Sequence, residues 1–109
     1  MKLIIAIVQD EDAQKLISAL MNEGYGVTKL ATTGGFLRAG NTTLLIGVDN
    51  TKLDHAISIV EKVCKSRKQV ATSPFPVSGS TGVYVPYPVE VTVGGATVFV
   101  VDVEKFLKI

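Results

Sequence analysis

The sequence predicts a single α+β domain of the ferredoxin-like class, with an antiparallel sheet and two helices on one face. The predicted elements are ordered strand, helix, strand, strand, helix, strand and one extra strand, which is the split β-α-β pattern in two halves. The length of 109 residues suits one domain, here residues 1–109. The first strand is apolar on both faces, and two helices cover only one of them. We therefore expect identical subunits to cover the other face in a closed homo-oligomer.

The first half of the chain is expected to hold a helix between strands. A continuous β-branched apolar run at 2–8 predicts a central strand. Three acidic residues at 10–12 mark the start of a helix, whose apolar residues follow at helical spacing until Gly24 ends it. The remaining expected elements of this half are strands at 27–32 and 41–48 and a short glycine-bearing loop at 33–40.

The second half is expected to begin with another helix, from residues 49–51 to Cys64. Thr51 and Asp54 have capping-box spacing at its start. All four prolines fall within 74–88, which predicts a long loop at 69–88 that could serve as a lid or contact surface. The last expected elements are a strand at 89–93, a hairpin turn at Gly94 and Gly95, a strand at 96–103 and a helical turn at 104–108.

Composition excludes several classes of protein. The chain is 47% hydrophobic and 19% charged with a formal charge of +1, which argues against nucleic-acid coating and against a strongly basic membrane patch. The longest apolar run, at 3–8, is far too short to span a bilayer, so we expect no membrane insertion. One cysteine, Cys64, cannot form an internal disulfide, which fits a reducing compartment. We therefore expect a soluble, cytoplasmic protein.

Groups for catalysis are scarce, so we expect neither an enzyme nor a cofactor. The lone His55 has no metal-ligand partner at a suitable spacing, and Cys64 falls on an apolar helical stripe. The carboxylates of Asp10, Glu11 and Asp12 are explained by the helix dipole. No catalytic residue and no metal site are predicted.

The segment from Thr28 to Thr43 is the best candidate for binding a ligand. Its glycines allow backbone N–H groups to approach a phosphate, and its hydroxyls and two cations suit the same group. Phe36 and Leu37 could hold a flat base, and Asn41 could hydrogen-bond the edge of that base. The alternative is a hairpin loop whose glycines serve turns only, because no Walker A or dinucleotide fingerprint is present.

Four blocks of the sequence resemble the PII-like cyclic-di-AMP receptors of Gram-positive bacteria. These blocks are 4–10, 28–43, 86–91 and 93–100, and the most specific part is Ala31-Thr32-Thr33-Gly34-Gly35-Phe36-Leu37 followed by Gly40-Asn41-Thr42-Thr43. The resemblance covers essentially the whole chain. It implies a ferredoxin-like homotrimer without enzymatic activity, which binds the second messenger cyclic di-AMP in clefts between subunits. It also implies a short loop at 33–40 and a long one at 69–88.

The same resemblance implies roles for individual residues. It places Thr28 and the backbone of Gly35 near phosphate and adenine, and Phe36 and Leu37 against adenine. It implies that Asn41 contacts the edge of the base. The remaining positions that it implies are Gly47, for close approach of the ligand, and Phe99, contributed by the adjacent subunit.

The sequence departs from the family pattern at one position and at its C-terminal residues. Gly26 stands where relatives have an arginine that helps to hold the ligand, and the chain ends in Leu107-Lys108-Ile109 instead of His-Gln-Phe. Lys108 is the residue that could compensate, as a flexible point charge. The expected function is a signalling receptor in which ligand orders a loop and controls an unidentified downstream protein. Alternatives are a PII-like sensor of an ATP-type mononucleotide and an interaction module that binds no nucleotide.

Overall fold

A computed structural model of the chain describes residues 1–30, 40–76 and 84–109, with the backbone alone described at 71–76 and 84–87. The expected loop residues 33–39 therefore lie outside the described residues. The elements in chain order are β1 (Lys2–Gln9), α1 (Asp10–Asn22), β2 (Gly26–Lys29), β3 (Asn41–Val48), the 3₁₀ turn η1 (Asn50–Lys52), α2 (Leu53–Cys64), β4 (Arg67–Pro76), β5 (Tyr84–Val93) and β6 (Ala96–Asp102).

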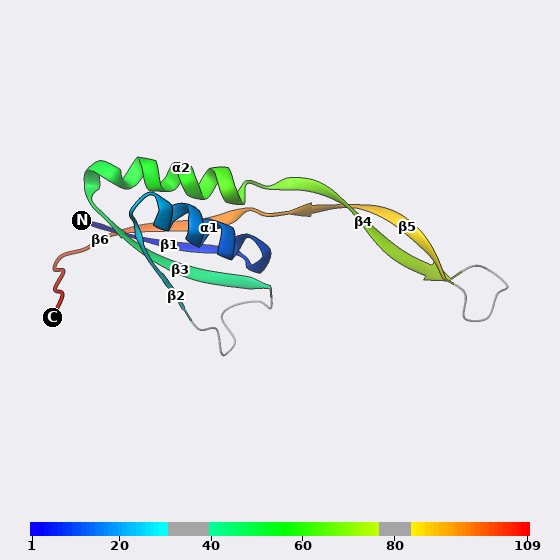
Figure 1. Cartoon of the computed structure of the whole chain (residues 1–109), viewed down its shortest axis with the longest axis horizontal. Helices are drawn as coiled ribbons and strands as arrows, with labels where there is room; N and C mark the ends of the chain where they lie inside the picture. Colours follow the sequence, from blue (N-terminus) through cyan, green and yellow to red (C-terminus); the bar gives the residue numbers. More distant parts are fainter. Residues whose placement is uncertain (31–39, 77–83) are drawn as a thin grey trace.

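The body of the molecule is a four-stranded sheet with strand order β2-β3-β1-β6, in which every neighbouring pair is antiparallel. Both helices lie on the same side of this sheet (Figure 1). Ile4, paired with Ile46 on β3, is fully buried beneath the helices together with Leu16 of α1 and Val60 of α2. This arrangement confirms the predicted α+β fold with two helices on one face.

The opposite face of the sheet is apolar and carries no helix from the described part of the chain. Residues that pair across antiparallel strands point to the same face, so Ile5 shares this open face with Leu45 of β3 and Phe99 of β6. Leu3 and its partner Val101 extend the face toward the chain termini. Phe99 is 53% exposed and Val101 is 42% exposed. In the isolated chain, two large apolar side chains thus remain in contact with water.

The start of α1 at Asp10 was predicted correctly, whereas α2 begins at Leu53 instead of at 49–51, and its expected capping box is not formed. Lys52 is the N-cap residue and makes no side-chain cap hydrogen bond. Instead, the chain enters α2 through η1, where the Lys52 N–H donates to the carbonyl oxygen of Asp49 at 2.9 Å. A backbone turn therefore precedes α2 in place of a capping box.

The expectation of a long loop at 69–88 was wrong for most of its length. β4 and β5 pair from Arg67 opposite Val93 to Pro76 opposite Tyr84, forming a two-stranded ribbon that projects away from the sheet (Figure 1). Prolines are tolerated because alternate residues of an antiparallel pair direct their N–H groups away from the partner strand. The prolines occupy such alternate positions, at 74 and 76 on one strand and at 86 and 88 on the other.

Three further expectations about the chain path were wrong. Gly94 and Gly95 do not close a hairpin, because β5 pairs with β4 whereas β6 pairs with β1; the two glycines, with φ of +83° and +90°, link the ribbon to the sheet. Pairing with β1 places the partly buried Val98 of β6 against the core. Residues 104–108 form no helical turn, and β2 ends at Lys29, so Leu30 lies outside the strand. Residues 31 and 32 of the expected strand lie outside the described residues.

Candidate functional site

A pocket of about 650 Å³ lies on the open face of the sheet, beside Met1 and the C-terminal residues. Both termini lie at this end of the sheet (Figure 1). β1, β2 and β3 form its floor, and the segment after β6 forms its wall. Four of the positions singled out in the sequence line it together: Gly26, Thr28, Gly47 and Lys108. The other lining residues are Met1, Leu3, Leu45, Val103, Phe106 and Leu107.

The strand register brings the floor residues together. Gly26 of β2 pairs with Gly47 of β3, and Thr28 pairs with Leu45. A Cβ atom added at Gly47 would lie 3.1 Å from Cε of Met1, so this glycine leaves little free space. A Cβ atom at Gly26 would have no neighbour within 4 Å. The pocket therefore has room for a larger side chain at position 26.

The chemistry of the lining is mostly apolar, with one hydroxyl and one charge. Leu3, Leu45 and Phe106 offer surface for a flat ring, and the side chain of Thr28 offers a hydroxyl. Lys108 is the only charged side chain among the described residues that line this pocket. Such a set suits a ligand that combines an aromatic ring with an anionic group.

The C-terminal wall is tied to the first strand by two contacts. The N–H of Val103 donates to the carbonyl oxygen of Met1 at 3.1 Å. Lys2 forms an ion pair with Asp102, and this hydrogen bond lowers the pKa of the Asp102 carboxyl. These contacts hold the start of the segment that carries Phe106 and Lys108 beside the pocket.

Two other predicted residues lie elsewhere in the same chain. Asn41 is six residues before Gly47 on β3, a separation of about 20 Å along the strand. It lines a different pocket, of about 260 Å³, near the root of the ribbon. Phe99 lies on the open face, in line with Ile5 and Leu45, outside the 650 Å³ pocket. Gly35, Phe36 and Leu37 fall outside the described residues.

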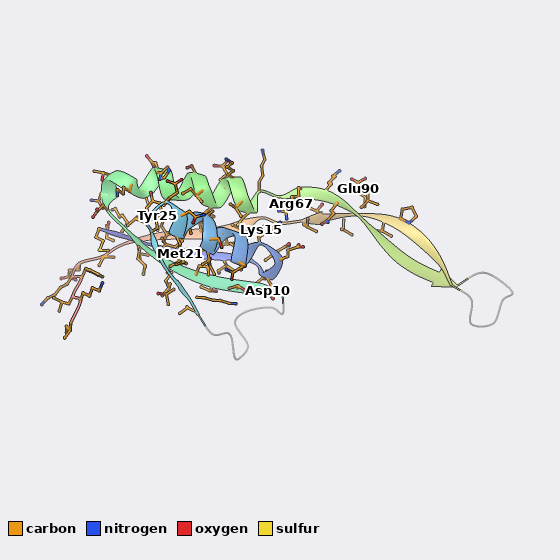
Figure 2. The ribbon with its side chains drawn as sticks, in the orientation of Figure 1. Asp10, Lys15, Met21, Tyr25, Arg67 and Glu90 are labelled. Atoms are coloured by element: carbon orange, nitrogen blue, oxygen red, sulfur yellow. The ribbon has the colours of Figure 1, made fainter. Side chains whose placement is uncertain are left out.

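A buried ion pair at the root of the ribbon was not predicted. Asp12, 1% exposed, accepts hydrogen bonds from both terminal nitrogens of Arg67, at 2.8 and 3.2 Å. Figure 2 shows Arg67 where α2 passes into β4. The signal in the sequence was the position of Asp12, on the same helical face as Leu16 and Leu20, because a carboxylate on a buried stripe requires a partner. The helix dipole alone does not account for it.

The single cysteine and histidine have structural environments. Burial, assisted by the charge of Asp12, raises the pKa of the Cys64 thiol to about 11, so the thiol is protonated at neutral pH. The Nδ1 atom of His55 lies 2.6 Å from the hydroxyl of Tyr25, a buried residue beside Gly26. Within residues 1–30, 40–76 and 84–109, no group of three metal-ligating side chains occurs, and no helix is long and apolar enough to cross a membrane.

The sheet, its two helices and the pocket on the open face define a small ligand-binding domain of the ferredoxin-like, PII-like class. The sequence model of the family described as "Cyclic-di-AMP receptor" matches residues 1–109, and the chain belongs to that family. Its members are signalling proteins that bind this dinucleotide and are not known as enzymes. The chain is also similar to the crystal structure of a functionally unknown protein from Pediococcus pentosaceus, with 39% identity and a TM-score of 0.78, over 99% of this chain and 96% of that one.

Proposed function

We propose that this protein is a signal-transduction receptor that binds cyclic di-AMP in clefts between the subunits of a cytoplasmic homotrimer. The observation that carries the proposal is the 650 Å³ pocket, in which Gly26, Thr28, Gly47 and Lys108 meet on a chain that matches the receptor family over its whole length. No catalytic residue is assigned.

The ligand and the lining have matching chemistry. Cyclic di-AMP carries two flat adenines and two phosphates. The hydroxyl of Thr28 donates to a phosphate oxygen in this proposal, Lys108 supplies positive charge, and the apolar wall at Leu45 and Phe106 contacts a base. The family resemblance adds the backbone of Gly35 near the phosphate and Phe36 and Leu37 against adenine.

A homotrimer would bring together predicted site residues that lie far apart within one chain. Phe99 is exposed and outside the pocket of its own chain, and we assign it to the pocket of the adjacent subunit. The same assembly would cover the open face at Phe99 and Val101, whose exposure is unfavourable for an isolated chain. Asn41, at the far end of β3, is assigned to the edge of a base in the complete site.

The signal is proposed to pass through two connections of the chain, the segment at 33–40 and the ribbon of β4 and β5. Ligand would order the segment at 33–40 or change the position of the ribbon, and the changed surface would engage or release a downstream protein. A ligand shifts such an equilibrium only as far as it binds one arrangement better than the other. The ribbon of β4 and β5 offers a surface for such a protein, because it projects clear of the sheet (Figure 1).

Isothermal titration against cyclic di-AMP and ATP tests the proposal. We expect binding of cyclic di-AMP at one molecule per subunit, with ATP a weak competitor. Preference for ATP would move the assignment to a mononucleotide sensor. Absence of heat at ligand concentrations of about 100 µM, with a folded trimer, would instead favour an interaction module without a nucleotide.

A further inference from the structure

A second pocket lies where the ribbon joins the sheet, at the opposite end of the sheet from the 650 Å³ pocket. It has a volume of about 260 Å³ and is lined by the amide side chains of Gln9 and Asn41, the hydroxyl of Thr97 and the backbone of Gly94 and Gly95. No charged side chain from the described part of the chain lines it. Its polar groups therefore suit an uncharged group that forms hydrogen bonds.

The orientation of the Gln9 amide is determined by its neighbour. Oε1 of Gln9 lies 2.7 Å from the backbone nitrogen of Gly94. Because a backbone N–H can only donate, the atom that meets it must be the amide oxygen. The NH₂ group of Gln9 is consequently the donor end of this amide and forms no hydrogen bond to another of the described side chains. Gln9 also pairs with Asn41 in the register of β1 and β3, so the two amides lie side by side at the strand ends.

Gly94 is closely packed against the residues that precede and begin β4. A Cβ atom added there would lie 2.6 Å from Nη1 of Arg67 and 2.7 Å from the carbonyl oxygen of Lys65. The Gly95 N–H donates to the carbonyl oxygen of Cys64 at 2.5 Å. A group that binds to Gln9 therefore contacts a side chain that is itself bonded to the root of the ribbon.

We propose that Gln9 is a further ligand-binding residue, which forms with Asn41 a subsite for an uncharged heteroaromatic edge with acceptor nitrogens, such as that of a purine base. This inference rests on the proposed function and extends its base contact from one amide to two. Since the Gln9 oxygen stays bonded to Gly94, a bound base also stabilises the root of the ribbon. Binding should therefore slow amide hydrogen exchange at Gly94.

The test compares the wild type with Gln9→Met, Gln9→Glu and the control Gln14→Met, in which the same change is made at an exposed position of α1. Gln9→Met should weaken binding of cyclic di-AMP about tenfold and abolish ligand-dependent protection at Gly94, whereas Gln14→Met should match the wild type. Gln9→Glu keeps the acceptor for Gly94 but loses the donors. It should exchange at Gly94 like the ligand-free wild type, yet bind weakly at both 0.1 and 0.5 M salt, where charge repulsion is screened.

Different results would overturn the role of Gln9 and the proposed function. If the wild type gives heat with cyclic di-AMP but Gln9→Met binds as tightly as Gln14→Met, Gln9 is not a ligand contact and the proposed function stands. The same conclusion follows if Gln9→Glu regains wild-type affinity in high salt. If the wild type binds no cyclic di-AMP, both the proposed function and this inference are overturned.

Discussion

Arg67 at the start of β4 and Asp12 in the first turn of α1 form a two-point ion pair across 55 residues of sequence, with nitrogen to oxygen distances of 2.8 and 3.2 Å. The Asp12 side chain is 1% exposed, whereas that of Arg67 is 41% exposed. The pair therefore joins the buried helix face to the root of the ribbon and neutralises a carboxylate that water does not reach.

Arg67→Met should lower the urea midpoint of unfolding, because it leaves the buried Asp12 carboxylate without its partner, although solvent screens the exposed part of the pair. The matched control is Lys68→Met. Lys68 pairs with Glu90 at 3.2 Å, with both side chains largely exposed, so its loss should cost less than about 0.5 kcal/mol. Urea unfolding measures both; equal midpoints for the two variants would show that Asp12 does not depend on Arg67.

Gly26→Arg should strengthen binding of cyclic di-AMP. The pocket has free space at position 26, and a charge-assisted hydrogen bond to phosphate contributes about 1.5 to 3 kcal/mol, or one to two orders of magnitude in Kd. Isothermal titration of the variant and the wild type measures the change. An unchanged or weaker affinity would mean that the phosphates do not lie near Gly26.

Lys108→Met should weaken binding about tenfold and reduce its dependence on salt, because the pocket loses the one charged side chain in its described lining. Lys105→Met is the matched control, since Lys105 is exposed and outside the lining. Titrations at two salt concentrations distinguish the variants. The same loss of affinity in both would indicate a general effect of net charge and not a contact made by Lys108.

Cys64 should react slowly with thiol reagents in the native protein. Its pKa is raised from 9.0 to about 11, so at pH 8 the native protein holds about a hundredfold less thiolate than the unfolded chain. A folded-state pKa above the unfolded value means that this thiol contributes stability below pH 9, which is lost as the pH rises toward 11. Following the reaction at pH 8 with and without urea measures the difference. Equal rates would show that Cys64 is accessible in the native state.

The central sheet and both helices were predictable from local patterns. The apolar residues of β1 fall on both faces of the strand, and those of α2 form one stripe at helical spacing. Each pattern predicts both the type of element and the faces that are buried. The long-range consequence, an open apolar face, followed because the pattern showed more apolar surface than two helices can cover.

The path of the second half depends on pairing between distant strands. Prolines at 74–88 are a loop signal locally, and only the register of β4 with β5 shows that they fall at positions where no ladder donor is needed. Gly94 and Gly95 carry a turn signal, but which strands pair beside them is decided by contacts with β1. Local sequence does not encode either choice.

The candidate site was predictable in part. Gly26, Thr28, Gly47 and Lys108 were identified from the sequence and its family resemblance, and the structure brings them to one pocket. The Asp12–Arg67 pair and the bond from Gly94 to Gln9 were missed, because their partners are separated by 55 and 85 residues. No spacing rule relates such positions, although a carboxylate on a buried helical stripe signals that a partner exists.

Native mass spectrometry of the purified protein with cyclic di-AMP tests the proposed receptor function, because it reports subunits and ligands in one measurement. We expect a complex of three chains that carries three molecules of cyclic di-AMP. A single chain, or a trimer that remains free of ligand when cyclic di-AMP is in excess, would contradict it.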